Sequence, residues 1–157
     1  MPLAGLRLFG ETGASNLAVT AKTVAGKCRG NDMAFDIIEY PEKRLLVIEH
    51  WESADNAAVV EASIKMGARV VDPVFKRILI DVRKSVVEFD LDALVENNRD
   101  FMALISDDAK VAYAMHPERH RDEAAAIRGV AERESFALCI EFNREAALGW
   151  LMDQSVG

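Results

Sequence analysis

Apolar and polar residues follow two different periods along the chain from Met33 onward. Short runs rich in β-branched and aromatic residues predict strands. The predicted strands cover residues 34–40, 44–51, 76–82, 110–115 and 136–142. The later strands are separated by stretches whose apolar residues recur three and four positions apart, which predicts amphipathic helices. The predicted order is therefore β-β-α-β-α-β-α-β-α.

The predicted helices begin at residues that favour helix starts. Ser53, Asp90 and Asn143 can each accept a hydrogen bond as an N-cap, and Pro117 is tolerated in a first turn. The inner face predicted for the first helix comprises Ala57, Val60, Ile64, Ala68 and Val71. The core positions predicted for the second helix are Leu91, Leu94, Val95, Phe101, Met102 and Ile105. The last helix is predicted to turn Ala147, Trp150 and Leu151 inward.

The connections between the strands predict how the sheet is paired. The turn at residues 41–43 is short and contains Pro41, which favours an antiparallel hairpin. The later strands are joined through helices, and such crossovers are right-handed and give parallel pairing. We therefore predict an α/β fold with a mixed five-stranded sheet. The nearly continuous apolar run at 76–82 is typical of a central strand.

The domain organisation follows from length and composition. A chain of 157 residues suits one domain, which we place at residues 33–153, followed by a C-terminal tail at 154–157. Residues 1–32 are rich in glycine and carry a net charge of +2, although the whole chain carries −7. We predict that residues 1–32 are a flexible or weakly structured extension. A short hairpin added to the edge of the domain and a targeting segment are the alternatives.

Charge and hydropathy exclude several partners. An acidic chain disfavours nucleic acid and anionic membrane surfaces. No apolar run approaches the ~18 residues that a membrane span needs, so we expect no integral membrane segment. Cys139 lies in an apolar run and Cys28 lies between cations, which makes them a poor disulfide pair. This favours a reducing compartment, and we expect the cytoplasm.

The strand "ILIDVR" and the closing stretch "IEFNREAALGWL", together with the order of elements, resemble the SpoIIAA-like group of the STAS superfamily. The resemblance covers about residues 33–153 and implies that fold, an architecture also compared with CRAL-TRIO lipid-transfer domains. It also implies regulation of a protein partner through a serine at the start of the helix after the central strand. Asp81 matches the Asp that ends that strand in the family. Residues 87–91, Val-Glu-Phe-Asp-Leu, replace the expected Ser-Ser-Gly, so we do not expect a phosphoserine switch.

Signatures of catalysis are absent from the sequence. There is no glycine-rich phosphate loop, no Gly-x-Ser-x-Gly elbow and no Cys-x-x-Cys motif, so we predict no catalytic residues and no cofactor. His50 has no paired nucleophile, and its neighbour Trp51 is interpreted as a packing residue. His116 and His120 are four residues apart, but Pro117 separates them and no third ligand is indicated. We therefore predict a polar helix start and not a metal site.

The best position for a ligand or partner contact is the carboxyl edge of the sheet. Ligands of open α/β sheets bind beyond the carboxyl ends of the strands. Arg83, Lys84 and Ser85 are predicted to form a basic loop there, with a solvated turn as the alternative. His116 and Asn143 would lie on the same edge if the strands are parallel, and Asp90, at the start of the helix after the third strand, is a further candidate contact.

These observations predict a non-enzymatic STAS-like protein-interaction or regulatory module. Its partner would be another protein or a second copy of the chain as a dimer. The first alternative is a carrier of a small apolar molecule or lipid on the same sheet. The least favoured alternative is an enzyme that uses His50 or His116.

Overall fold

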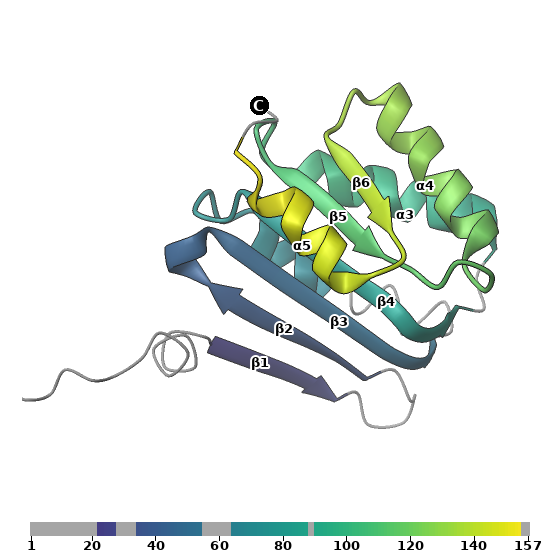
Figure 1. The fold of residues 1–157 in the computed structure, drawn as a ribbon, viewed down its shortest axis with the longest axis horizontal. Helices are drawn as coiled ribbons and strands as arrows, with labels where there is room; N and C mark the ends of the chain where they lie inside the picture. Colours follow the sequence, from purple (N-terminus) through teal and green to yellow (C-terminus); the bar gives the residue numbers. More distant parts are fainter. Residues whose placement is uncertain (1–21, 28–33, 55–63, 88–89, 155–157) are drawn as a thin grey trace, which may run out of the picture.

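The computed structural model describes residues 22–27, 34–54, 64–87 and 90–154. Within these ranges the chain forms one six-stranded sheet whose strands lie side by side in chain order (Figure 1). The strands are β1 (Lys22–Lys27), β2 (Ala34–Tyr40), β3 (Leu45–Ala54), β4 (Arg77–Val87), β5 (Lys110–Ala114) and β6 (Leu138–Glu141). β1, β2 and β3 pair antiparallel, whereas β3 to β6 pair parallel. The predicted α/β class, mixed sheet and order of its five strands are confirmed.

The sixth strand, β1, comes from the segment for which we ranked a flexible or weakly structured extension first. Residues 22–27 pair antiparallel with residues 34–39 of β2, the arrangement that the hairpin alternative expects for this part of the segment. The edge of β2 presents backbone N–H and C=O groups that a further strand satisfies. The other residues of 1–32 lie outside the described ranges.

The helices confirm two of the predicted caps. α3 (Leu91–Leu104) begins after Asp90, whose carboxylate accepts from the Asp92 amide, and α5 (Arg144–Met152) begins after Asn143, whose side chain accepts from two amides. α4 (Arg121–Arg133) begins four residues later than Pro117. The predicted cap at Ser53 is wrong, because β3 continues pairing with β4 as far as Ala54. Residues 64–70 are helical, and a short 3-10 helix, η1 (Pro41–Lys43), joins β2 to β3. No helix of the described ranges is long and apolar enough to cross a membrane.

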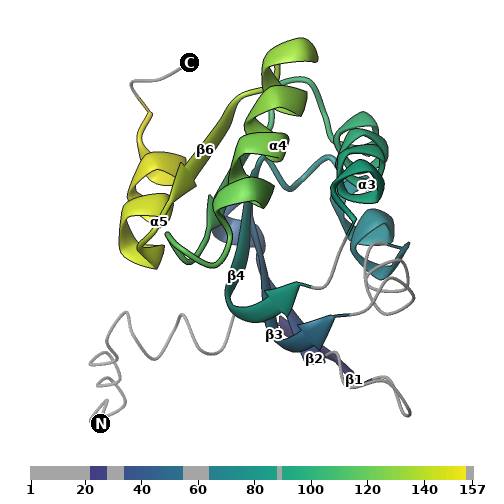
Figure 2. The same cartoon turned by 90° about the vertical axis from the view of Figure 1, so that its right-hand side faces the viewer.

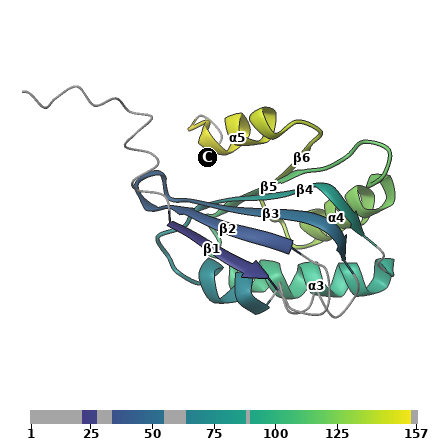
Figure 3. The ribbon, with the colours of Figure 1, turned by 90° about the horizontal axis from the view of Figure 1, so that it is seen from below.

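The sheet separates two unequal hydrophobic cores. Figure 3 shows that helices lie on both faces of the sheet. Residues 64–70, α3 and α4 cover one face and enclose the larger core. Its best-buried side chains include Phe35, Ile37, Leu46, Ile48, Ile78, Val70, Val111 and Met115. On the other face, α5 covers a smaller core formed by Leu45, Val47, Leu79, Ala112, Ala114, Ala147 and Leu151. Cys139, predicted to be buried, is half-buried against this second core, whereas Cys28 lies outside the described ranges.

The inner face predicted for the first helix is wrong where the structure describes it. Ile64 and Val71 are 69% and 52% exposed, whereas Met66 and Val70 are buried. The helix is rotated relative to the predicted stripe, because the large Met66 side chain reaches the core together with Val70. In α3 the predicted core positions are confirmed from Leu94 onward, but Leu91 is 42% exposed because it lies in the first turn, at the rim.

A buried polar pair connects α3 to the central sheet. The Tyr113 hydroxyl donates to Asn98 Oδ1 at 2.6 Å, and Asn98 Nδ2 donates to the Leu94 carbonyl at 2.9 Å. Burial raises the pKa of Tyr113, so the hydroxyl remains protonated and a donor. The pair fixes α3 against β5 at one position in an otherwise apolar contact.

We expect Tyr113→Phe to lower the free energy of unfolding by about 1–3 kcal/mol, because Asn98 Oδ1 would be buried without a partner. Urea denaturation followed by circular dichroism measures the change. Tyr40→Phe is the matched control, since Tyr40 is half-buried and its hydroxyl makes no hydrogen bond among the described residues. Equal effects of the two substitutions would contradict the role assigned to the Asn98–Tyr113 pair.

Candidate functional site

The residues predicted as a basic loop belong to a strand. Arg83, Lys84 and Ser85 all lie within β4, so the predicted loop at 83–85 is wrong. Pairing with β3 passes from Glu49↔Asp81 to Trp51↔Lys84, which leaves one additional residue on β4. After this bulge β4 pairs with β3 again from Lys84 onward. The strand therefore continues beyond the end of its apolar run.

Two acidic and two basic side chains form an ion cluster at this bulge, on the α5 face of the sheet. Asp81 is buried, and Arg83 donates to it through its backbone N–H at 3.2 Å and through Nε and Nη2 at 2.9 Å each. Arg144, the first residue of α5, contacts Asp81 at 3.5 Å and pairs with Glu49. Burial alone would raise the pKa of Asp81, but the hydrogen bonds from Arg83 and the charges of both arginines outweigh it, and the pKa is lowered. The cluster fastens α5 to the end of β4.

Ser85 and two histidines form a second network on the opposite side of β4. Ser85 is 1% exposed, and its hydroxyl donates to the Val82 carbonyl at 2.9 Å. The Ser85 carbonyl lies 3.0 Å from His120 Nε2. Since a carbonyl only accepts, Nε2 carries the proton, and Nδ1 of His120 then accepts from the His116 amide at 2.9 Å. The network joins the end of β4 to the start of α4.

The His116 side chain also forms hydrogen bonds with the backbone in this network. This side chain is half-buried at the turn after β5, and its Nδ1 accepts from the Glu118 and Arg119 amides at 3.3 and 3.2 Å. The Nδ1 atoms of both histidines are therefore occupied by backbone donors. In the part of the chain that the structure describes, no group of three His, Cys, Asp or Glu residues is placed to hold a metal ion.

His50 lies on the other face of β3 from the ion cluster, at the end of the larger core. It is 7% exposed and its ring contacts that of Phe35, with 6.0 Å between the centroids. Burial lowers its pKa to about 4, an effect that the charge of Asp81 partly offsets. His50 is therefore a neutral core residue at pH 7. Trp51 is half-buried on the opposite side of the strand.

Figure 2 looks toward the edge at which β4, β5 and β6 end. Four side chains at the end of β4 and the start of α3 are exposed there, and we call them the β4–α3 edge: Lys84, Val86, Asp90 and Leu91. Two of them are large apolar residues, Val86 at 44% and Leu91 at 42% exposure. Of the five predicted contact residues, Lys84 and Asp90 reach this surface. Arg83, Ser85 and His116 are held behind it by the contacts described above.

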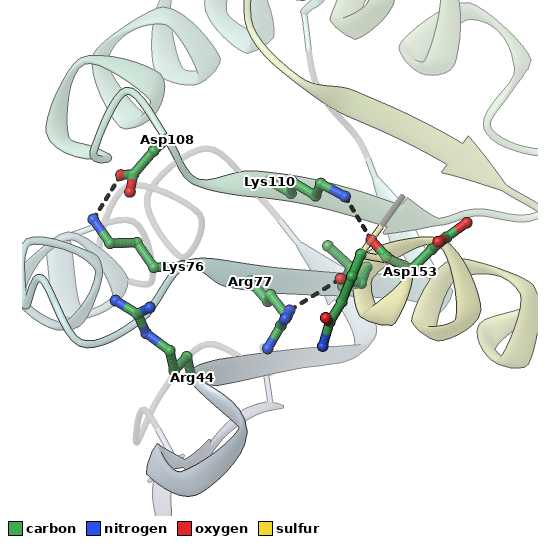
Figure 4. Close-up of a pocket in the computed structure, with 8 residues that line it drawn as sticks. Arg44, Lys76, Arg77, Asp108, Lys110 and Asp153 are labelled. Carbon is green, nitrogen blue, oxygen red and sulfur yellow. Dashed lines mark hydrogen bonds and ion pairs between the residues drawn. The ribbon is translucent and has the colours of Figure 1, made fainter. Parts of the chain in front are cut away.

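A concave site lies at the opposite edge of the sheet, where β4 and β5 begin. A pocket of about 240 Å³ is lined by Arg44, Lys76, Arg77, Asp108, Lys110, Leu151, Asp153 and Gln154 (Figure 4). We call it the basic pocket. Sequence reasoning missed it because Arg44, the Lys76–Arg77 pair and Lys110 are separated by 32 and 33 residues, and each simply precedes an apolar run. Only the register of the parallel strands brings these positions together.

An apolar groove lies beside α5 on the smaller face of the sheet. It has a volume of about 320 Å³ and is lined by Tyr40, Lys43, Leu45, Val47, Arg144, Leu148 and Met152. α5 covers β4, β5 and β6 but stops short of β2, which leaves this groove open to solvent.

The comparisons with known proteins identify the fold. No protein-family model and no curated protein matches the chain. The chain is similar to the crystal structure of an anti-sigma factor antagonist from Mycobacterium paratuberculosis, at 16% identity over 85% of this chain and 95% of that chain, with a TM-score of 0.53. An uncharacterised protein of the DUF3478 family with a SpoIIAA-like fold, from Shewanella loihica PV-4, is 12% identical over 83% of this chain and 93% of that chain, with a TM-score of 0.48. The chain therefore has the SpoIIAA-like STAS fold.

The burial of His50 predicts a stability that depends on pH. The folded pKa of about 4 lies below the unfolded value of about 6.5, so protonation favours the unfolded chain. The stabilisation is complete above pH 6.5 and is lost as the pH falls toward 4. Between pH 7 and pH 5 we expect a loss of about 2 kcal/mol from this group.

Urea denaturation of the wild type and of His50→Gln at both pH values tests this expectation. The variant should lose much of the pH dependence, although a smaller slope remains because burial also lowers the pKa of His120. If the two proteins lost the same free energy between pH 7 and pH 5, His50 would not be the buried titrating group.

Proposed function

We propose that this chain is a non-enzymatic STAS-type interaction module that docks a protein partner through the β4–α3 edge. The partner surface would carry an apolar centre, to cover Val86 and Leu91, and a lysine or arginine beside it, to face Asp90. Docking would not depend on phosphorylation of a serine. This proposal rests chiefly on one observation, two large exposed apolar side chains, Val86 and Leu91, that flank the acidic residue Asp90 in the sequence.

The character of the β4–α3 edge supports this proposal. Groups of exposed apolar side chains are typical of interaction sites, and Val86 and Leu91 lie within five residues of each other in the chain. Asp90 and Asp92 give the start of α3 a permanent negative charge, which the helix dipole favours. The similar structure from Mycobacterium paratuberculosis is described as an anti-sigma factor antagonist, which agrees with a regulatory module that binds proteins.

The state of Ser85 is the main argument against a phosphoserine switch at this edge. Its hydroxyl is buried and already donates to a backbone carbonyl. Phosphorylation would require this buried hydroxyl to become exposed and to give up its hydrogen bond. Asp90 occupies the helix start at which the resemblance expects the phosphorylated serine, so the charge that a phosphate would bring is partly present already.

The arrangement of the histidines argues against an enzyme. His50 is enclosed in the core, and Nδ1 of His116 accepts from two backbone amides. General base catalysis needs a residue within hydrogen-bond reach of a substrate proton. Among the described residues, neither histidine contacts a serine or cysteine side chain that could act as a nucleophile.

Leu91→Gln tests the docking surface, with Leu104→Gln as the matched control. Both leucines lie in α3, at opposite ends, and are 42% and 47% exposed. We expect Leu91→Gln to weaken partner binding about tenfold, because the lost burial of a leucine costs affinity of that order. Leu104→Gln should bind as the wild type does.

The measurement is quantitative affinity capture from lysate of the native cells, followed by titration of the purified partner. Asp90→Asn adds a second variant that keeps the helix cap but removes the charge, and it should weaken binding most at low salt. A partner that binds Leu91→Gln and Leu104→Gln equally well would place the docking surface elsewhere.

The groove beside α5 favours a second candidate function, a carrier of a small apolar molecule. Its floor is apolar, and Lys43 and Arg144 at its rim could face a carboxylate. Native mass spectrometry of freshly purified protein separates the two candidates. A bound acyl mass that is lost on Leu148→Gln would support a carrier, whereas a protein without added mass would support the docking module.

A further inference from the structure

The basic pocket concentrates positive charge in an acidic chain. Four cations, Arg44, Lys76, Arg77 and Lys110, surround it, together with the carboxylates of Asp108 and Asp153 (Figure 4). Four positive charges less two negative ones leave +2 at the pocket, whereas the whole chain carries −7. Hydrogen bonds from Lys76 and Ser106 lower the pKa of Asp108 to about 2, so this carboxylate is ionised at pH 7. With Asp108 ionised, the residues that line the pocket carry an excess of two positive charges at pH 7.

The cations are held in place by bonds that use only part of their donor capacity. Arg77 donates through Nε to the Leu151 carbonyl at 3.1 Å and through Nη1 to the Lys43 carbonyl at 2.7 Å. Lys110 donates to the Asp153 carbonyl at 3.0 Å. Since a guanidinium has five donors and an ammonium three, further N–H groups remain for a ligand. The existing bonds orient these side chains before any ligand arrives, which lowers the entropic cost of binding.

Arg44 has the largest unused donor capacity of the four. Among the described residues its guanidinium makes one hydrogen bond, from Nε to the Val74 carbonyl at 3.4 Å, which leaves both Nη groups. Its backbone has φ 54 and ψ 35, the left-handed conformation that favours glycine. Its carbonyl accepts from the Lys76 and Arg77 amides at 3.0 Å each, which holds this conformation against the start of β4. A glycine would meet the backbone requirement at this position, so the backbone does not explain the arginine.

We infer that the basic pocket binds a small dianionic oxyanion of the phosphate type, either free or as a phosphomonoester. The excess charge of +2 matches a phosphate group, which carries about −1.5 to −2 at pH 7. Planar guanidinium groups on Arg44 and Arg77 suit its tetrahedral oxygens through paired hydrogen bonds. The volume of about 240 Å³ is below the range of drug-sized ligands, which indicates a small molecule. The site lies at the opposite edge of the sheet from the β4–α3 edge and does not depend on the proposed docking function.

Nuclear magnetic resonance of the ¹⁵N-labelled full chain tests this site. Inorganic phosphate, glycerol 3-phosphate and acetate are titrated at constant ionic strength and a pH of about 7.5, where phosphate is mostly dianionic. We expect saturable shifts of the Lys76, Arg77 and Lys110 amides with a Kd of about 1 mM or below for phosphate or its ester. Saturation by both probes identifies the phosphate group as the ligand, and saturation by glycerol 3-phosphate alone identifies a phosphomonoester.

Three variants distinguish binding by the residues of the pocket from attraction by the overall charge of the protein. Arg44→Gln should weaken binding about tenfold, since a charge-assisted hydrogen-bond donor is lost. Arg99→Gln makes the same change in net charge on α3, where Arg99 is half-exposed, and should leave the Kd within about twofold because of screening. Arg44→Gly should weaken binding as much as Arg44→Gln without lowering the unfolding midpoint, because glycine suits the left-handed backbone.

Three results would overturn the site. The first is the absence of saturable shifts with either phosphate probe. The second is equal binding of acetate, which would show that no dianion is selected. The third is equal weakening by Arg44→Gln and Arg99→Gln, which would show that the anion responds to net charge alone.

Discussion

The parallel pairing of β3 with β4 is the constraint on which the rest of the structure depends. It runs from Leu45↔Arg77 to Ala54↔Val87 and contributes side chains to both hydrophobic cores. The length of this pairing determines where both ends of β4 lie. The first residue of β4, Arg77, points into the basic pocket, and the last residues of β4 lie in the β4–α3 edge. Without the bulge between Glu49 and Trp51, the pairing would end near Asp81 and β4 would not extend as far as Val86.

The continuation of β4 beyond its apolar run needs polar stabilisation, since charged and small residues replace the aliphatic ones there. Arg83 forms two side-chain hydrogen bonds with the buried carboxylate of Asp81, and Arg144 adds its charge from α5. A buried carboxylate in a sheet would cost several kcal/mol without such partners. On the opposite side, His120 satisfies the carbonyl of Ser85. The two networks therefore allow a strand with a polar sequence to extend into the region where the loop was predicted.

Patterns with a local physical cause were predictable from the sequence. The strand cores, the caps Asp90 and Asn143, and the order of elements follow from periodicity and hydrogen-bond chemistry within a few residues. The extension of β4 through Ser85 was not predictable, because its stabilising partners Arg144 and His120 are far away in the sequence. The prediction of the inner face of residues 64–70 was wrong for a related reason. Ile64 and Met66 are both apolar, and only the packed core decides which of them is buried.

The candidate site shows the same division between local and distant causes. The sequence predicts a contact at the carboxyl edge, where Lys84 and Asp90 are exposed, whereas Ser85 is buried and Arg83 and His116 are half-buried. The basic pocket combines the starts of three strands with the end of α5, and only strand register brings its residues together. A parallel sheet aligns the starts of its strands at one edge and their ends at the other. One short domain can therefore carry an apolar and acidic surface at one edge and a cationic pocket at the other, and the rigid β3–β4 pairing keeps the two apart.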